Sequence, residues 1–392
     1  MEDVAILSGA RTPIGAFMGS LSSLTAPQLG AVAIKAAIER AGIRPEEVDE
    51  TIMGCVLTGG MGQAPARQAA RAAGIPDSVP ALTINKVCGS GMKSAIIAAQ
   101  EIKCGDAKIV LAGGMESMSN APYLLDKART GYRMGNGTIV DSMILDGLWD
   151  PYNDCHMGTC GDLASREHNV SREQLDEFAA ESYRRAVLAQ ESCRLSEEIV
   201  PVSVPQRRGD PIVVDQDEEP KKSDPAKLAA LRPAFGKEGV TTAGNASSID
   251  DGAAAMVIAA AAEAERRGIK PLGKLLGYAG HAQDPQWFTT APAFAIEKLL
   301  AKHGLSVEDI DIFEINEAFS VVPMLAAEKL RIPMEKINVN GGAVSLGHPI
   351  GMSGARLIVT ALYELRRRGG RYAIATPCIG GGEATAVLLG AA

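Results

Sequence analysis

The chain of 392 residues has few aromatic side chains, few histidines and no excess of positive charge. Aromatic residues make up 4% of it, there are 5 histidines, and the formal net charge is −8. Such a chain lacks the basic surface field that holds nucleic acid non-specifically. It also lacks any uninterrupted apolar run of the roughly 18 residues needed to cross a bilayer. We therefore expect neither nucleic acid nor a membrane as a partner.

The cysteines and the chain ends exclude two further classes. The 7 cysteines are odd in number and scattered, which is not the pattern of a disulfide framework. Residues 1–7, MEDVAIL, carry two acids and no signal or transit pattern, and the final LLGAA resembles no targeting tail. We expect a cytoplasmic protein. The length and the 46% of hydrophobic residues predict an α/β protein of roughly two to three domains.

An internal duplication organises the chain. Residues 33–49 align without a gap with residues 295–311, and five positions are identical. Further on, CGSGMKSAII from Cys88 aligns with HPIGMSGARL from His348. If the two copies pack about a pseudo-twofold axis, a thiol and an imidazole meet at matching helix starts. A nucleophile beside its base is a catalytic arrangement.

Each copy alternates helices and strands, and the strands are short, apolar and without alternation, as in sheets covered on both faces. This order predicts two duplicated βαβαβ-type halves in a five-layered α-β-α-β-α arrangement, with the two inner helices shared between the sheets. In the first half we expect helices at 27–41 and 89–103, strands at 50–56 and 109–114, and an apolar segment at 81–87. In the second half we expect helices at 293–303 and 349–368, and strands at 311–315, 337–340 and 372–376.

Residues 118–248 have no counterpart in the duplication, and we interpret them as an inserted loop domain that covers the site and binds substrate. A helix at 172–190 begins with a capping box formed by Ser171 and Gln174. The segment is too long for a passive connection. A purely oligomeric arm is the alternative, and both roles are compatible. The remaining domains are then 1–117 with 249–269, and 270–392.

Cys88 is the candidate nucleophile. It directly precedes a helix, with Gly89 and Gly91 at the turn, where backbone N–H groups and the helix dipole stabilise a thiolate. A nearby imidazole would lower the pKa of the thiol further from about 8.5. A lone cysteine is more often a buried core residue, but the alignment with His348 favours catalysis here.

Three more residues complete the candidate site. His348 lies in a glycine-rich segment that lets the backbone approach a ligand closely. Cys378 ends a strand and precedes three glycines at 380–382, whose amides suit an oxyanion. A nucleotide-binding glycine loop is the alternative, but no GxGxxG follows an early strand. Asn316 lies just past another strand, where a neutral amide can hold a water or a carbonyl.

Together these segments resemble the thiolase family, specifically its acetyl-CoA acetyltransferases. The resemblance covers essentially the whole chain, and it rests on the segments NKVCGSG, NEAF, GGAVSLGHPIGMSGAR, CIGGGEA, MGTCGD and TAGNAS. It implies the five-layered thiolase fold and a homotetramer, built as a dimer of dimers. It also implies acyl-CoA substrates and a reaction without metal or cofactor, since coenzyme A is itself a substrate.

The resemblance also implies a role for each catalytic residue. Cys88 takes the acyl group, His348 activates it, and Cys378 is the acid and base for the α-carbon of a second acetyl-CoA. Asn316, through a water, and His348 form one oxyanion hole, and the backbone amides of Cys88 and Gly380 form the other. Carbon–carbon bond formation needs an α-proton removed and an enolate held, which matches these groups.

For binding of coenzyme A, the resemblance implies contacts spread over several segments. Lys221 and Lys222 would reach the ADP phosphates, with a solvated lysine pair as the alternative. Phe288 departs from several short-chain relatives, which carry Met nearby, and this leaves the acyl-chain preference open. The other expected contacts are Ser247, Ala243, His156, Met157 and Ala318.

Several other functions stay open or are disfavoured. A degradative 3-ketoacyl-CoA thiolase for longer chains would share every catalytic residue. A ketoacyl synthase is disfavoured, because NEAF stands where a second histidine is expected. A non-catalytic CoA-binding protein would not need the four polar positions. A metal site made of Cys155, His156 and Cys160 lacks the paired Cys-x-x-Cys spacing of structural zinc sites, so we expect no metal.

Overall fold

Two sheets, joined edge to edge by a short pairing, form the framework of the molecule. The computed structural model describes residues 3–222 and 224–392. The first sheet has the order β4-β3-β5-β12-β1, and the second has the order β14-β15-β17-β13. They meet at one edge, where β1 pairs with β13 through only two residue pairs, Ala5 with Lys274 and Ile6 with Gly273. Because the parallel pairs β3–β4, β3–β5 and β14–β15 lie beside antiparallel ones, both sheets are mixed.

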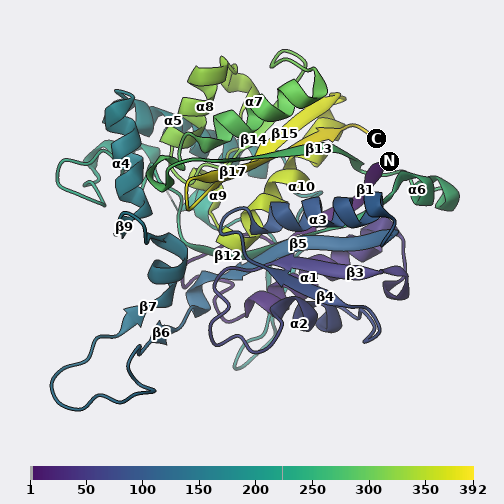
Figure 1. Ribbon diagram of the computed structural model, residues 1–392, viewed down its shortest axis with the longest axis horizontal. Coiled ribbons are helices and arrows are strands. Elements are labelled where there is room, and N and C mark those ends of the chain that lie inside the picture. The colour runs from purple at the N-terminus through teal and green to yellow at the C-terminus, as the bar shows by residue number, and fades with distance from the viewer. Residues whose placement is uncertain (1–2, 223) are drawn as a thin grey trace.

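The helices lie in three layers around these sheets, which confirms the five-layered fold (Figure 1). Helices α3 and α10 pack against each other and against both sheets, so they are the shared inner layer. Helices α1 and α2 cover the outer face of the first sheet, and α7 and α8 cover that of the second. The elements of the first half are β1 (Val4–Arg11), β2 (Gly15–Ala16), α1 (Ala26–Ala41), β3 (Glu50–Gly54), α2 (Pro65–Ala72), β4 (Ala81–Ile84), α3 (Ser90–Cys104), β5 (Ile109–Ser117), β12 (Asp250–Ala260) and α6 (Ala261–Arg267).

The second half repeats this plan. Its elements are β13 (Gly273–Ala282), α7 (Ala291–His303), β14 (Ile312–Ile315), α8 (Val321–Leu330), α9 (Ala343–Leu346), α10 (Ile350–Arg368), β15 (Tyr372–Thr376), β16 (Cys378–Ile379) and β17 (Glu383–Gly390). The prediction of a strand at 337–340 is wrong, because Ile337 alone forms a bridge, to Phe313 of β14. This bridge lies beside β14 as β4 lies beside β3 in the first half. The Asn338 side chain explains this, since its amide makes both backbone bonds of Ile315, at 2.8 and 2.7 Å, as a strand would.

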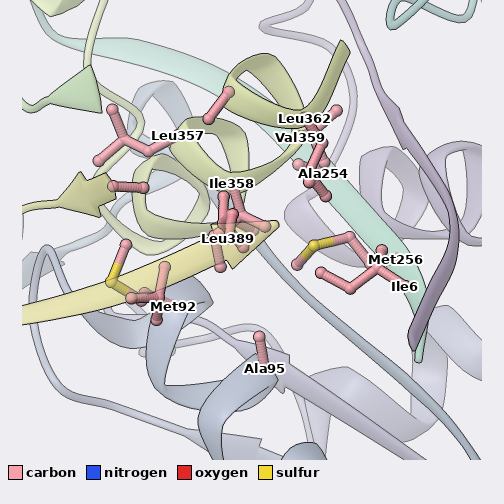
Figure 2. Packing of buried hydrophobic residues seen from close by; sticks show 14 of the residues in the cluster. Ile6, Met92, Ala95, Ala254, Met256, Leu357, Ile358, Val359, Leu362 and Leu389 are labelled. Carbon is pink, nitrogen blue, oxygen red and sulfur yellow. The ribbon is translucent and has the colours of Figure 1, made fainter. Parts of the chain in front are cut away.

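The inner layer is the centre of the core. Figure 2 shows Ile358 of α10 beside Leu389 of β17, with Met92 and Ala95 of α3 below them and Ile6, Ala254 and Met256 of the first sheet to the right. Every residue of α10 from Ile350 to Leu365 is buried, as expected of a helix enclosed on all sides. Glycines let α3 and α10 cross closely, because a Cβ on Gly91 would lie 2.8 Å from the backbone nitrogen of Ala355.

The inserted segment forms smaller elements beside this core. Its long helix, α5, begins with the expected capping box of Ser171 and Gln174. A long loop between β6 and β7 extends away from the body (Figure 1). Within the described residues, no helix combines the length and apolar character needed to cross a bilayer. The elements are β6 (Tyr123–Leu124), β7 (Val140–Asp141), β8 (Trp149–Asp150), β9 (Cys155–His156), α4 (Met157–Glu167), α5 (Arg172–Glu191), β10 (Val202–Val204) and β11 (Ile212–Val214).

Candidate active site

A strained turn between β4 and α3 presents Cys88. Val87 has a φ of 47°, in the left-handed region that β-branched residues avoid. The Asn85 side chain accepts the Val87 N–H at 2.9 Å, and the Ser90 hydroxyl donates to the Val87 carbonyl at 2.7 Å. Backbone strain of this kind persists only where surrounding bonds fix it, often at functional sites. The chain then enters α3 at Ser90, two residues after Cys88.

A second turn presents His348, two residues before α10 begins at Ile350. The backbone N–H of His348 donates to Oδ2 of Asp250 at 2.7 Å, so the first residue of β12 anchors the turn. Gly347 has a φ of 105°, and a Cβ there would lie 2.5 Å from the carboxyl carbon of Asp250. Only glycine therefore fits beside that buried carboxylate.

The fold brings these two turns together, as the duplication suggested. Nε2 of His348 lies 3.3 Å from Sγ of Cys88. Nδ1 of His348 lies 2.6 Å from Oγ of Ser353, whose hydroxyl hydrogen goes to the Pro349 carbonyl at 2.9 Å. Because that hydrogen is already used, Oγ accepts a bond from Nδ1–H. This tautomer leaves the lone pair of Nε2 facing the thiol.

Burial sets the protonation of the pair. It lowers the pKa of His348 to about 3, with the Arg356 charge adding to the effect. It also raises the pKa of Cys88 to about 11, although the backbone amides of Gly380 and Cys88 pull it down. The sequence predicted a lowered thiol pKa, and the direction is the opposite, because loss of solvation outweighs the amides and the helix terminus. The resting pair is a neutral thiol beside a neutral imidazole.

Asn316 approaches the same imidazole from the end of β14. Its Nδ2 lies 3.4 Å from Nε2 of His348, and its Oδ1 is buried without a hydrogen-bond partner among the described residues. The backbone N–H of Asn316 donates to Thr376 at 3.0 Å, which continues the pairing with β15. The next residue, Glu317, fixes the turn, because its carboxylate accepts from Ser182 at 2.7 Å and from the Val344 N–H at 3.1 Å.

Cys378 is fully buried in β16, behind the cavity surface. Burial raises the pKa of its thiol well above the usual value, and the charge of Cys88 raises it further. Gly381 and Gly382 follow with φ of 91° and 81°, so the tight turn from β16 to β17 requires glycine at both.

An apolar cavity of about 220 Å³ opens onto Cys88 and His348. Of the residues singled out from the sequence, eight line it: Cys88, His348, Gly380, His156, Met157, Ser247, Phe288 and Ala318. Asn316 and Cys378 lie in the protein behind the lining. Ala243 is exposed and does not line the cavity. Lys221 and Lys222 do not line the cavity either. Lys221 donates to Gln216 at 2.6 Å, and Lys222 forms an ion pair with Glu218 at 2.7 Å.

Several residues of the site were not singled out from the sequence, including Leu148, Phe235, Phe319 and Ser353. Leu148, Phe235 and Phe319 line the cavity, and the ring of Phe235 stacks on His156 at 4.6 Å. Phe319 belongs to the NEAF segment, so its position beside Asn316 was a usable signal. Phe235 and Leu148 come from the inserted segment, where no pattern marks them. Ser353 stands within GMSGAR but carries no signal of its own.

A duplicated α/β fold defines a cysteine-dependent acyltransferase when it places a cysteine and a histidine before its two inner helices and a second cysteine after a strand of the second half. Residues 4–262 match the thiolase N-terminal domain, and residues 269–391 match the thiolase C-terminal domain. The chain belongs to the thiolase family.

Relatives match this chain over nearly its whole length. Acetyl-CoA acetyltransferase 2 of Arabidopsis thaliana is 53% identical over 99% of this chain and 97% of its own. The acetyl-CoA acetyltransferase of Cupriavidus necator is 49% identical over 99% of both chains. The crystal structure of Acat5 thiolase from Ascaris suum in complex with coenzyme A superposes with a TM-score of 0.95, at 44% identity and over 100% of both chains.

Proposed function

We propose that this enzyme joins two molecules of acetyl-CoA into acetoacetyl-CoA and free coenzyme A, and runs the reverse thiolysis, through an acetyl group carried on Cys88. The contact of 3.3 Å between Cys88 Sγ and the unprotonated Nε2 of His348 carries this proposal. The full-length relatives named acetyl-CoA acetyltransferase support the choice of substrate.

The first half-reaction transfers an acetyl group to the enzyme. Nε2 of His348 takes the Cys88 proton as the sulfur attacks the thioester carbonyl, so the thiolate forms only when its substrate is present. The backbone amides of Cys88 and Gly380, which already stabilise negative charge on the sulfur, donate to the developing oxyanion. Coenzyme A leaves as its sulfur takes the proton of Cys378, so Cys378 becomes a thiolate and Nε2 of His348 keeps the proton that it took from Cys88.

The second half-reaction forms the carbon–carbon bond. The thiolate of Cys378 removes a proton from the methyl carbon of the second acetyl-CoA, and its raised pKa makes it a strong base. Nδ2 of Asn316 and the protonated Nε2 of His348 donate to the enolate oxygen. The carbanion attacks the acetyl carbon on Cys88 and the C–S bond breaks. The Cys88 sulfur takes the proton held on Nε2 of His348, while Cys378 keeps the abstracted proton, which restores the resting enzyme.

We assign the three segments distinct tasks in this chemistry. Residues 1–117 with 249–269 supply Cys88, and residues 270–392 supply the other catalytic groups. The inserted domain, 118–248, binds coenzyme A, because it provides cavity-lining side chains such as His156, Met157 and Phe235. No cofactor is needed, since the thioesters and protein groups account for every bond made and broken. Lys221 and Lys222 bind the ADP phosphates in this proposal only after Lys221 leaves Gln216 and Lys222 leaves Glu218.

We further propose a homotetramer in the cytoplasm, active in fatty-acid metabolism. The loop between β6 and β7 extends from the body and exposes Leu125, Met134 and Ile139, with Met134 99% exposed. Apolar side chains in this position favour burial against other copies of the chain. Each of the seven cysteines is a free thiol, which favours a reducing compartment. Light scattering on purified enzyme tests the tetramer, and a monomer at micromolar concentration would contradict it.

The direct test is CoA-dependent cleavage of 3-ketoacyl-CoAs of increasing length. We expect the highest kcat/KM with acetoacetyl-CoA and no cleavage by the Cys88→Ala variant. A maximum at medium or long chains would instead identify a degradative thiolase. Activity persisting in Cys88→Ala would overturn the acyl-cysteine mechanism itself.

A further inference from the structure

A second group of reactive side chains lies outside the catalytic cavity, where the β8–β9 hairpin meets α4. The Sγ atoms of Cys155 and Cys160 are 3.9 Å apart, and Sγ of Cys160 lies 3.9 Å from Oδ2 of Asp150. All three ligand atoms lie within 4.8 Å of one another. The acyl-transfer chemistry uses none of these side chains, so their convergence needs a separate explanation.

The spacing fits a shared tetrahedral metal ion. Zn–S bonds of about 2.3 Å place two sulfurs of such a site about 3.8 Å apart, and a zinc-bound oxygen about 3.5 Å from each sulfur. The two sulfurs here are 3.9 Å apart. A modest inward shift of the Asp150 carboxylate and of Cys155 completes the three-ligand geometry.

The carboxylate is oriented toward the sulfurs by its own hydrogen bonds. Oδ1 of Asp150 accepts the N–H of Tyr152 at 2.8 Å and that of Asn153 at 3.2 Å. Oδ2 accepts the side-chain amide of Asn153 at 2.8 Å and keeps its remaining edge toward Cys160. Outer hydrogen bonds of this kind fix metal ligands in proteins. Asp150 and Cys160 are both 2% exposed, so this arrangement is built into the fold.

A second cavity gives solvent access to the two sulfurs. It has a volume of about 660 Å³, and Cys155 and Cys160 both line it. Phe235 lines this cavity as well as the catalytic one, so a single ring stands between the two. The cavity leaves a fourth coordination position open for water.

We propose that Cys155, Cys160 and Asp150 bind a thiophilic divalent cation of the zinc class, with water as the fourth ligand. Both thiols release their protons to solvent on binding, so two thiolates and one carboxylate face the dication. His156 does not belong to this ligand set, because its Nδ1 accepts the Gly158 N–H at 3.1 Å and neither ring nitrogen converges with the other three ligand atoms. The chelate spans 155–160 and encloses His156 and Met157 of the catalytic cavity wall, so the ion stiffens that wall.

A disulfide is the other product that two adjacent thiols form. The buried Asp150 carboxylate opposes the thiolate that disulfide formation requires, because like charges 3.9 Å apart repel. The same carboxylate favours a cation. The chemistry of the cluster therefore points to metal binding.

Titration of the metal-free, reduced full chain with Co²⁺ tests the site. The titration uses the Cys88→Ala background, which removes the catalytic thiol as a competing ligand. We expect a thiolate-to-cobalt charge-transfer absorption that saturates at one ion per chain and disappears when Zn²⁺ displaces the cobalt. This readout is independent of catalysis, so it does not depend on the proposed function.

Three variants and one control locate the ion. Cys155→Ser and Cys160→Ser should abolish the band, and Asp150→Asn should weaken binding by about tenfold or more. Cys193→Ser removes an exposed cysteine elsewhere and should leave the titration unchanged. If the buried Cys160 variant fails to fold, the half-buried Cys155 variant still decides the question. The absence of a band, or a band that persists in Cys155→Ser, overturns the proposal.

Discussion

The hydroxyl of Ser353 accepts a hydrogen bond from Nδ1 of His348 at 2.6 Å, because its own hydrogen is held by the Pro349 carbonyl 2.9 Å away. This relationship fixes which imidazole nitrogen carries the hydrogen. The tautomer in turn decides whether Nε2 is able to take the Cys88 proton. A helix backbone therefore sets the chemistry of the catalytic pair through a single serine.

Ser353→Ala should lower kcat by about 10- to 100-fold, with a smaller effect on KM. Without the hydroxyl, His348 is free to adopt the tautomer with hydrogen on Nε2, which does not accept the thiol proton. Steady-state thiolysis gives both constants, and iodoacetamide should alkylate Cys88 more slowly at neutral pH. Ser165→Ala is the matched control, because Ser165 is a buried helix serine whose hydroxyl donates to the Gly161 carbonyl at 2.9 Å. Equal losses in both variants would count against a positioning role.

The free energy of unfolding should fall as pH drops from about 6.5 toward 3. Burial lowers the pKa of native His348 to about 3, whereas the unfolded imidazole binds a proton below its ordinary value near 6.5. The unfolded state therefore binds more protons in this range, and each such proton costs about 1.4 kcal/mol of stability per pH unit. The His348→Asn variant should lose less stability than the unchanged chain between pH 6.5 and 4.5 in urea unfolding. Identical pH slopes for the two proteins would contradict the lowered pKa.

Gly91→Ala should destabilise the protein by about 1–3 kcal/mol, the usual cost of overpacking a core. The added Cβ would lie 2.8 Å from the Ala355 nitrogen and 2.9 Å from the Gly351 carbonyl, so α3 and α10 must separate. Because these helices carry Cys88 and His348 at their starts, activity should fall by more than stability alone explains. Gly236→Ala is the control, since a Cβ there meets nothing within 4 Å. Urea unfolding and kcat measure the two effects, and a variant as active and stable as the control would refute the close-crossing argument.

Phe288→Leu should raise the cleavage of longer 3-ketoacyl-CoAs several-fold relative to acetoacetyl-CoA. Phe288 is 2% exposed, lines the catalytic cavity and meets the ring of Phe319 edge-on at 6.1 Å, so a smaller side chain enlarges that wall. The ratio of kcat/KM values across chain lengths measures the change. Phe294→Leu, which removes a ring stacked on His281 outside the cavity, should leave the ratio unaltered. A Phe288 variant with an unchanged ratio would mean that another wall limits the acyl chain.

The duplication allowed the fold and the main catalytic contact to be predicted, because equal positions in two copies imply equal places about a symmetry axis. Cys88 and His348 each lie two residues before their helices, as the alignment requires. The strand expected at 337–340 failed for a reason that composition does not show. Asn338 uses its side chain in place of a backbone strand, and no pattern of apolar residues reports that substitution.

The protonation state of Cys88 and the contacts between distant segments could not be predicted from the sequence, for a different reason. The pKa of Cys88 depends on desolvation by segments distant in the chain, and these outweigh the local helix terminus. The role of Ser353 depends on which carbonyl takes its hydrogen. Asp150 lies ten positions before Cys160, so the spacing of cysteines and histidines alone pointed to His156 as the third group of a metal site.

Catalysis depends on an acetyl group carried by Cys88, and mass spectrometry of peptides from enzyme mixed with acetyl-CoA tests this dependence most directly. After rapid acid quenching, we predict one acetyl group on the peptide that contains Cys88, its loss when excess coenzyme A is added, and none in Cys88→Ala. An acetyl group on the Cys378 peptide instead, or turnover without any acetylated cysteine, would contradict the mechanism.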